Sequence, residues 1–513
     1  MLERFNFGGV NLTAGEHASA GKPLSETPFC IAILGDFSGR AHRGIVDAKS
    51  VRERRGVSID RDNFDNVLAG LKLELHLQTK ESGPIVFRFS ELEDFHPDRL
   101  FEHAAFEKLR GLRKRMEDPS TFGEVVEELG LPSSPQNPAP PQTNRAPAKA
   151  PSAVGLASGS LLDDLIEQTE ARGSSVMTAR KKDDVHEFAR QIAAKYAVSA
   201  PDPRRPEFVS AVDRAIADVM RAILHNRDFQ ALEAIWRATF FLVRQLETGP
   251  QLRLHLFDIS KAELAGDVAT SDVRESGLFR LLVEKGVLTP GADPWAVVVG
   301  DYSFGSSKED LTALAAVSKI AQQAGAPFLA AADGSMIGAE SLAVSPHPRD
   351  WKATETQDLW SNLRRQPEAD SLGLALPQFL LRLPYGEKTS PIDAFDFEEF
   401  AGSPVHEDYL WGNGAFAVAL LLGESFSDSG WQMHPGSVAQ IDRLPLHLYS
   451  TGGESESKPC AEVLFTEDAV QRILDNGLIP LVSYKGRDSV RIARFQSIAE
   501  GDAPKPLAGR WVP

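Results

Sequence analysis

The sequence predicts an α/β protein in which a small mixed α/β domain precedes a larger α/β body with a mainly parallel sheet. Short apolar or alternating runs typical of strands are separated by longer stretches whose apolar residues have helical spacing. A proline-rich stretch interrupts this pattern once. The chain has 513 residues, which is too long for one ordinary core and favours several domains.

The interruption covers residues 131–159, which contain seven prolines and neither an aromatic nor an acidic residue. Such a segment buries too little apolar surface to offset the entropy lost on ordering, so we expect an exposed linker. The predicted domains are therefore residues 1–130 and residues 160–513.

The small domain contains three predicted strands and a helix. FCIAILG at 29–35 is a continuous apolar run and predicts a buried strand. LKLELHLQ at 71–78 and PIVFRFS at 84–90 alternate apolar and polar residues, which is typical of half-buried strands. The apolar residues of 98–116 have helical spacing. Together these elements make a compact mixed unit.

The larger body shows strands alternating with helices, a rhythm that predicts a mainly parallel sheet with helices on its faces. The predicted helices are 160–170, which begins at the N-cap Ser160, most of 183–245, and 311–325. The predicted strands are 252–260, 295–304 and 327–332, followed by a strand–helix–strand unit from 460 to 485.

The charge balance limits the classes of partner. The 72 acidic and 55 basic residues give a formal charge of −17, so the whole chain has no field that attracts nucleic acid or an anionic membrane. The N-terminus lacks the pattern of a signal peptide, and no apolar run reaches the length of a membrane helix. We expect a cytoplasmic protein without nucleic-acid or membrane partners.

The chain offers no recognisable catalytic, metal or cofactor motif. Cys30 and Cys460 both lie in apolar runs and are expected to be buried free thiols. PYGEKTS at 384–390 lacks the glycines of a phosphate-binding loop and is interpreted as a helix-start turn. ILGDFSGR at 33–40 is interpreted as a strand exit in which Asp36 or Ser38 satisfies backbone donors.

His406, Glu407 and Asp408 follow one another in the sequence VHEDYLWGN. Consecutive side chains point in different directions on a helix or a strand, so they do not share a ligand-binding face. We therefore assign no catalytic, metal-binding or cofactor-binding residue and expect a protein that is not an enzyme.

The part of the chain before the linker resembles the small sheath subunit of type VI secretion, TssB or VipA. The resemblance rests on PFCIAILGDFSGR (28–40), SIDRDNFDNVL (58–68) and ELEDFHPDRL (91–100). In the last of these, Asp98 is expected to cap or precede a helix whose entry Pro97 fixes.

The part after the linker resembles the large sheath subunit, TssC or VipB. The similar stretches occur in the same order and include HNRDFQALEAIWRATFFLV (225–243), LHLFDISKAEL (254–264), VVVGDYSF (297–304), LRLPYGEKTSPIDAFDFEE (381–399) and HEDYLWGNGAFAVAL (406–420). The whole chain thus resembles the two subunits joined end to end.

The resemblance implies a contractile-sheath-like fold and a mechanical function without catalysis. Sheath subunits pair, stack around an inner tube and contract, and an AAA+ ATPase of the ClpV type takes the contracted sheath apart. The expected partners are other sheath subunits and further copies of this chain, together with the inner tube, the baseplate and that ATPase. The alternative is a small-molecule-binding or enzymatic α/β protein that reuses the fold.

The resemblance also singles out the helix predicted at 160–170. In the family, the corresponding helix of the large subunit is the element that the ATPase recognises. The apolar stripe that matches it comprises Leu161, Leu162, Leu165 and Ile166.

The family usually continues beyond the position of FQSIAE (495–500) into strands exchanged between neighbouring protomers, whereas this sequence ends at LAGRWVP. On that basis we expect limited self-assembly and a role as a sheath building block or as an accessory that caps, seeds or limits the sheath.

Overall fold

The computed structural model describes residues 4–7, 10–13, 23–79, 83–129, 202 and 204–511. The chain forms two compact units, one of residues 1–107 and 213–513 and the other of residues 108–212. Both units therefore draw on the two sides of the predicted linker, which are called here the N-terminal segment and the C-terminal segment. The predicted boundaries at 130 and 160 lie outside the described residues, and that division stays a prediction.

The first unit contains a nine-stranded sheet in the order β13-β17-β16-β10-β9-β8-β3-β7-β4. The six strands from β16 to β7 run parallel, as the sequence predicts, and antiparallel strands flank them on both sides. The strands are β3 (Phe29–Gly35), β4 (Val57–Ile59), β7 (Leu252–Asp258), β8 (Trp295–Phe304), β9 (Phe328–Ala332), β10 (Leu372–Leu376), β13 (Gln440–Ile441), β16 (Ile479–Ser483) and β17 (Val490–Ile492).

Strand β3 of the N-terminal segment lies inside this sheet, between two strands of the C-terminal segment. It pairs with β7 over its whole length, from Phe29 opposite Leu252 to Gly35 opposite Asp258, and with β8 on its other side. All seven residues of β3 are buried. A parallel strand that is covered on both faces needs apolar side chains at every position, which explains its continuous apolar run.

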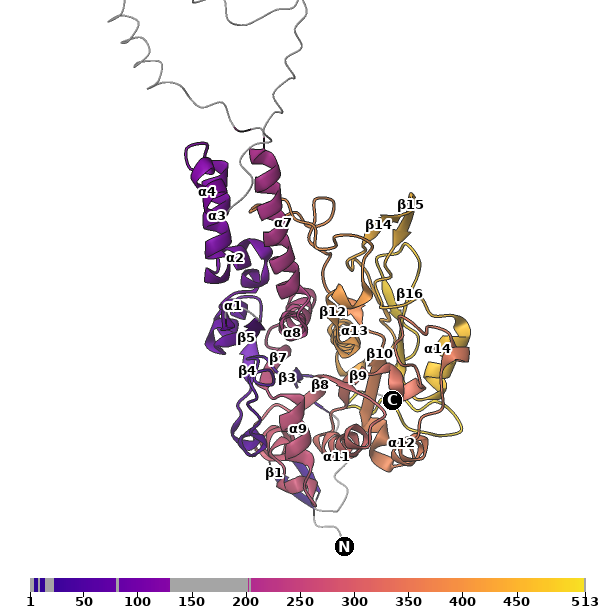
Figure 1. The fold of residues 1–513 in the computed structure, drawn as a ribbon. Coiled ribbons are helices and arrows are strands. Elements are labelled where there is room, and N and C mark those ends of the chain that lie inside the picture. The colour runs from indigo at the N-terminus through magenta and orange to yellow at the C-terminus, as the bar shows by residue number, and fades with distance from the viewer. Residues whose placement is uncertain are drawn as a thin grey trace, which may run out of the picture. The chain divides into compact units, whose positions relative to one another are not determined.

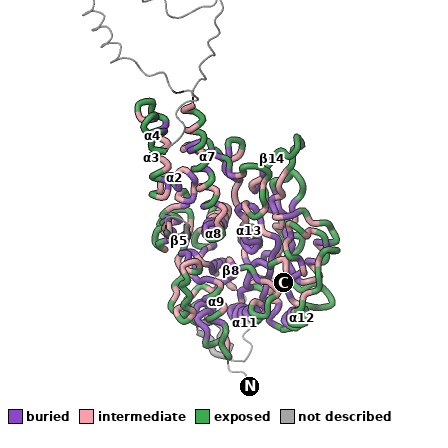
Figure 2. Tube along the Cα trace, in the orientation of Figure 1, coloured by how far each residue is buried: buried purple, intermediate pink, exposed green. Residues whose placement is uncertain are grey.

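Helices cover both faces of the sheet (Figure 1). Helices α9 (Lys261–Val268) and α11 (Lys308–Ala324) pack on one face, with α12 (Gln357–Arg364) beside α11. Helix α13 (Gly414–Ser429) lies on the other face next to α8 (Arg227–Gln245). The buried residues follow this layered arrangement (Figure 2).

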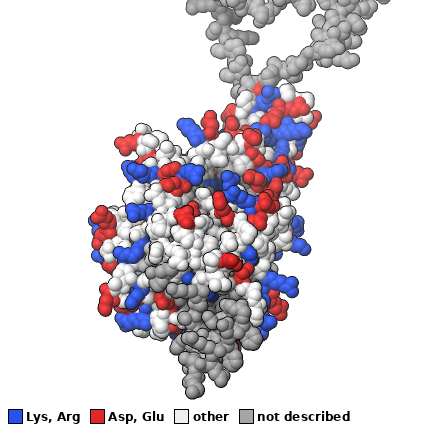
Figure 3. Space-filling model, turned by 180° about the vertical axis from the view of Figure 1, so that it is seen from behind, with Lys and Arg blue, Asp and Glu red and all other residues white. Residues whose placement is uncertain are grey.

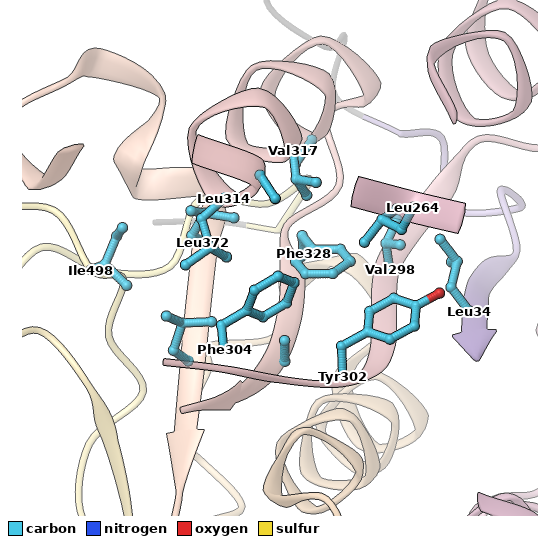
Figure 4. Packing of buried hydrophobic residues seen from close by; sticks show 14 of the residues in the cluster. Leu34, Leu264, Val298, Tyr302, Phe304, Leu314, Val317, Phe328, Leu372 and Ile498 are labelled. Atoms are coloured by element: carbon cyan, nitrogen blue, oxygen red, sulfur yellow. The ribbon is translucent and has the colours of Figure 1, made fainter. Parts of the chain in front are cut away.

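The core on the α9 and α11 face is built from strand and helix residues that meet between the layers (Figure 4). Val298 and Phe328 from the sheet lie among Leu264 of α9 and Leu314 and Val317 of α11. Each of these side chains is at most 1% exposed. Burial of such residues is worth about 1.5–3 kcal/mol each, so this layer accounts for much of the stability of the sheet.

Smaller elements complete the first unit. Its two-stranded antiparallel sheets are β1 (Arg4–Phe7) with β2 (Val10–Thr13), β5 (Leu73–Thr79) with β6 (Gly83–Phe89), β11 (Phe379–Leu380) with β12 (Trp411–Gly412), and β14 (Leu448–Thr451) with β15 (Glu454–Ser457). Its other helices include α1 (Phe64–Gly70), α2 (Pro97–Glu102), α10 (Gly277–Phe279), α14 (Glu467–Asp475) and a π-helix, η5 (Arg280–Leu288). None of the described helices is long and apolar enough to cross a membrane.

The second unit is helical in its described part. It contains most of α3 (Glu107–Glu117), all of α4 (Phe122–Glu128) and the first residues of α7 (Arg205–Leu224). The rings of Phe122 and Phe208 lie 5.9 Å apart. Val125 and Val126 of α4 are buried. An aromatic contact thus joins a helix of the N-terminal segment to a helix of the C-terminal segment.

Two predicted elements differ from the structure. The helix expected at 98–116 is divided into α2, a 3-10 turn (Ala104–Phe106) and α3. The reason is His103, whose backbone is extended and whose Nδ1 accepts a hydrogen bond from the N–H of Ala105, so that it ends one helix and starts the next turn.

The strand expected at 460–465 is also wrong. In this stretch only Ala461 forms a bridge, to Phe379. The apolar pattern arises because Cys460, Ala461 and Val463 are buried in an irregular segment. The helix 160–170 and the residues of 183–245 before 202 lie outside the described residues. The other predicted strands and the helix at 311–325 are confirmed.

Candidate functional site

The two segments are joined first by the turn that follows β3. The carboxylate of Asp36 accepts hydrogen bonds from the backbone N–H groups of Arg40 and Ala41, so the predicted strand exit is confirmed. Ser38 donates from its backbone N–H and from its hydroxyl to the carboxylate of Asp258 at the end of β7. The end of the N-terminal strand is thereby fixed to its neighbour in the C-terminal segment.

A buried carboxylate receives two arginines of the N-terminal segment. Glu263 of α9 is paired with Arg40 at 2.7 Å and Arg54 at 3.1 Å, and its side chain is 0% exposed. Glu263 also caps its own helix by accepting from the backbone N–H of Ser260. Burial opposes the charged form, but the hydrogen bonds from Arg40 and the backbone outweigh it and lower the pKa of Glu263.

Aromatic side chains form a second connection between the segments. The indole N–H of Trp236 in α8 donates to the carbonyl of Phe37 at 3.0 Å. The rings of Phe37 and Phe64 lie 5.4 and 5.6 Å from that of Trp236, both edge-on. Phe95 meets Phe229 of α8 in the same way at 5.7 Å. Such edge-to-face pairs add specific geometry to the apolar burial, so α8 is held in one position against the N-terminal segment.

Asp98 connects the segments in a way that the sequence does not predict. The N-cap of α2 is His96, and Pro97 occupies the first helical position as expected. The carboxylate of Asp98 instead accepts hydrogen bonds from the backbone N–H groups of Asp393 and Ala394. The predicted role of Asp98 as a helix cap is therefore wrong. Its carboxylate oxygens accept hydrogen bonds from the C-terminal segment, and His96 is the N-cap of α2.

A buried network of charges lies between α8 and the loop after β11. Arg382 donates to Glu233 at 3.0 Å and to Glu399 at 2.8 Å, and the three side chains are 9%, 0% and 1% exposed. Arg237 is the second partner of Glu233, at 2.6 Å. Burial disfavours a charged Glu399, but Arg382 and further hydrogen bonds outweigh it and lower its pKa to about 2.

This network includes a residue of the turn at 384–390. The guanidinium of Arg382 lies over the ring of Tyr385 at 4.3 Å, and the backbone N–H of Tyr385 donates to Glu399 at 2.7 Å. His96 of the N-terminal segment packs edge-on against the same ring at 5.0 Å. The stretch is a turn, but no helix starts there, because it wraps around the buried charges.

The side chains of His406 and Asp408 have different partners. His406 lies 3.3 Å from Glu462 and accepts from the ammonium of Lys458 at 2.8 Å, while Asp408 lies 3.4 Å from His225. His406 and Glu407 line a cavity of about 420 Å³ at the carboxyl ends of β8, β9 and β10. No three histidine, cysteine or acidic side chains of the described part of the chain are placed to hold a metal ion.

Three aspartates lie at or near the carboxyl ends of three neighbouring strands, β3, β7 and β8. Asp36 and Asp301 line a smaller cavity of about 200 Å³, and Asp258 lies at the end of the strand between β3 and β4. Burial raises the pKa of Asp301 to about 7. The sequence analysis missed Asp258 and Asp301, although each lies inside a predicted strand, because one acidic residue within a strand carries no signal of its own.

The two cysteines are buried and free, as predicted. The predicted ATPase-recognition residues Leu161, Leu162, Leu165 and Ile166 lie outside the described residues. The sequence analysis also missed the ion network. One feature of the sequence could have indicated this network. Glu233 and Arg237 are four residues apart inside the apolar stretch FQALEAIWRATFFLV.

The surface carries charges of both signs side by side rather than one basic area on the face seen in Figure 3. This agrees with the balance of the sequence, in which acidic residues outnumber basic ones. Among the described residues, the buried polar contacts that connect the two segments include those of Ser38 with Asp258 and of Glu263 with Arg40 and Arg54.

In comparisons with known proteins, each of the two segments matches a family. Residues 206–499 match the family described as EvpB/VC_A0108, tail sheath N-terminal domain. Residues 10–128 match the family described as Type VI secretion system, VipA, VC_A0107 or Hcp2. A curated relative, the Type VI secretion system sheath protein TssC1 of Pseudomonas aeruginosa, is 32% identical over 315 residues. The match covers 58% of this chain and 63% of the relative.

The first of these families spans more than half of the chain, and its matched residues include all strands of the sheet except β3 and β4. Those two strands come from the VipA-like part. The protein belongs to the EvpB/VC_A0108 tail sheath family and carries a VipA-like segment ahead of the tail sheath domain.

Proposed function

We propose that this protein is a structural component of a type VI secretion contractile sheath. The observation that carries the proposal is that two sheath families match one chain in order and that their segments share one sheet. The role requires no bond to be made or broken, so we also propose that the protein is not an enzyme. A cytoplasmic location fits this role.

The geometry of β3 suits a part that bears load. Force between the segments passes through the ladders that β3 makes with β7 and β8. Pulling along the strand would load these hydrogen bonds together, whereas pulling apart a hairpin would break them one after another. The pairs of Glu263 with Arg40 and Arg54 lie beside the same strands and resist the same displacement.

The test is electron microscopy of the purified full chain, imaged first without partners and then mixed with separate small and large sheath subunits. We expect ordered tubes or rings that contain the chain. A tag inserted in the predicted linker, residues 131–159, would identify the chain in them. Single particles in every mixture, at concentrations where the separate subunits form tubes, would contradict the proposal.

The finer partners are proposed from the resemblance. We propose contacts with the inner tube, with the baseplate and with a ClpV-type ATPase, the last through Leu161, Leu162, Leu165 and Ile166. A peptide of residues 160–170 should bind the N-terminal domain of the ATPase, and Leu165→Asp should weaken that binding at least tenfold. A Gln168→Ala peptide is the control, since it leaves the apolar stripe intact. Equal binding by all three peptides would exclude this contact.

A further inference from the structure

A cavity of about 360 Å³ lies on the sheet at the end opposite to the aspartates. Its floor includes Cys30 of β3, Phe257 of β7 and Trp295 of β8, and its walls are the π-helix η5 and the turn after Arg54. The volume falls in the range of small-molecule sites, which are mainly apolar with a few converging polar groups. Of the residues that line this cavity, Arg54 also pairs with Glu263, and Cys30 lies opposite Trp295 in the ladder between β3 and β8.

The charged side chains that line this cavity are mostly basic, in a chain that is acidic overall. Arg253 is paired with Asp293 at 2.6 Å, and Arg54 shares Glu263 with a second arginine. For Arg55 and Lys285, the described residues provide no carboxylate within ion-pair distance. Two positive charges at the cavity are therefore left without a counter-charge.

Two buried N–H donors on the lining residues also lack partners. Among the described residues, neither Nε of Arg54 nor Nε1 of Trp295 has a hydrogen-bond acceptor. A buried donor without an acceptor costs about 1–3 kcal/mol, so native proteins rarely leave two of them at one place. The indole ring is held in position by edge-on contacts with His255 at 5.4 Å and Phe257 at 5.7 Å.

The wall next to Trp295 is an unusual helix. Residues Arg280–Leu288 form π-helical turns, a rare geometry that occurs frequently at functional sites. Gly286 lies against Trp295 so closely that a Cβ atom there would collide with Nε1. The helix also places Lys285 at the cavity, where its ammonium donates to the carbonyl of Arg52 at 3.4 Å.

We propose that this cavity binds a small organic phosphate, with the phosphate group at Arg55 and Lys285 and the body of the molecule between Phe257, Leu281 and Trp295. A phosphate monoester carries nearly two negative charges at pH 7, which matches the two unpaired cations. Arginine presents several N–H donors in a planar fork that matches phosphate oxygens, which suits the exposed guanidinium of Arg55. The cavity is larger than a bare phosphate ion needs, which leaves room for the organic body.

The experiment is calorimetric titration of the full chain at fixed ionic strength with adenosine 5′-monophosphate, glucose 6-phosphate, inorganic phosphate and adenosine. We expect at least one organic phosphate to bind at least tenfold more tightly than inorganic phosphate, and adenosine to bind more weakly still. The double variant Arg55→Ala/Lys285→Ala should weaken that binding at least tenfold. Both side chains are exposed, so the variant should fold, which circular dichroism can verify.

The matched control is Arg494→Ala/Lys485→Ala, which removes the same two charges from exposed positions that do not line this cavity. Absence of binding by both organic phosphates, or equal weakening in the control, would overturn the proposal. Tighter binding of a polyglutamate peptide than of either phosphate would also overturn it and would make the cavity a docking surface for another chain. Tube formation by the double variant tests the sheath function separately.

Discussion

Arg382 is held between two carboxylates in a place that water barely reaches. Its guanidinium pairs with Glu233 and Glu399, and it is the most buried arginine of this network. Removing one partner of a buried ion pair is costly because the remaining charge is left uncompensated. The contribution of each residue therefore depends on the presence of the others.

Glu399→Gln should destabilise the protein by roughly 3–5 kcal/mol at pH 7, because Arg382 loses one of its two charged partners in a buried site. Urea unfolding followed by circular dichroism measures this change. Glu387→Gln is the control, since Glu387 lies twelve positions earlier on the same loop and is exposed. A loss within about 0.5 kcal/mol of the control would show that the network contributes little.

The same residue predicts a dependence on pH. The pKa of Glu399 is about 2 in the folded protein and 4.5 in its ordinary state, so its contribution to stability is complete above pH 4.5. As pH falls from 4.5 towards 2, the folded state loses this advantage. The difference in unfolding free energy between the protein and Glu399→Gln should shrink between pH 5 and pH 3. A constant difference would contradict the low pKa.

At this scale the sequence predicts only part of the network. Charged residues four apart in an apolar helix indicate that Glu233 and Arg237 need buried partners. The partner Arg382 lies 149 residues further along the chain. Nothing local relates the two positions, and the sequence around residue 384 predicts a turn rather than a partner for a buried ion pair.

At the scale of elements, the sequence predicts β3 correctly as a buried strand, but it does not predict which strands pair with β3. An apolar run with Gly35 at its end specifies a strand covered on both faces, whereas its partners depend on contacts far along the chain. The sequence assigns β3 to a separate small domain. The structure places it between β7 and β8, where its apolar faces meet helices of the C-terminal segment.

Gly35→Ala should destabilise the protein by about 1–3 kcal/mol, because the new Cβ atom would collide with Ile235 of α8 and lie 3.1 Å from the Cβ atom of Asp301. Thermal unfolding measures the effect. Gly249→Ala is the matched control, since nothing lies within 4 Å of its Cβ position. Equal melting temperatures for the two variants would mean that α8 can move away from β3.

At the scale of the whole molecule, the resemblance correctly gives the family and the order of the segments, but not that they share a sheet. Family motifs identify local stretches, and a shared sheet is a property of pairing between stretches. The match to the curated relative spans 63% of that protein's length.

A protease site inserted within residues 131–159 should allow the chain to be cut without separating its segments. Because β3 is paired on both sides, the two pieces should elute together from a sizing column. They should part only in denaturant. Elution of two soluble pieces at their separate sizes, from protein that was folded before cutting, would contradict the shared sheet.

The position of β3 also has a consequence for synthesis. Ser38 contacts Asp258, which is made 220 residues later. At about 5–20 residues per second, the ribosome needs roughly 10–40 s to supply that partner. During this delay β3 has neither of its neighbouring strands, so its apolar side chains are exposed. We therefore expect chaperones to bind the nascent N-terminal segment. Because both segments belong to one chain, β3 is always made together with β7 and β8, and the two segments are produced in a ratio of one to one.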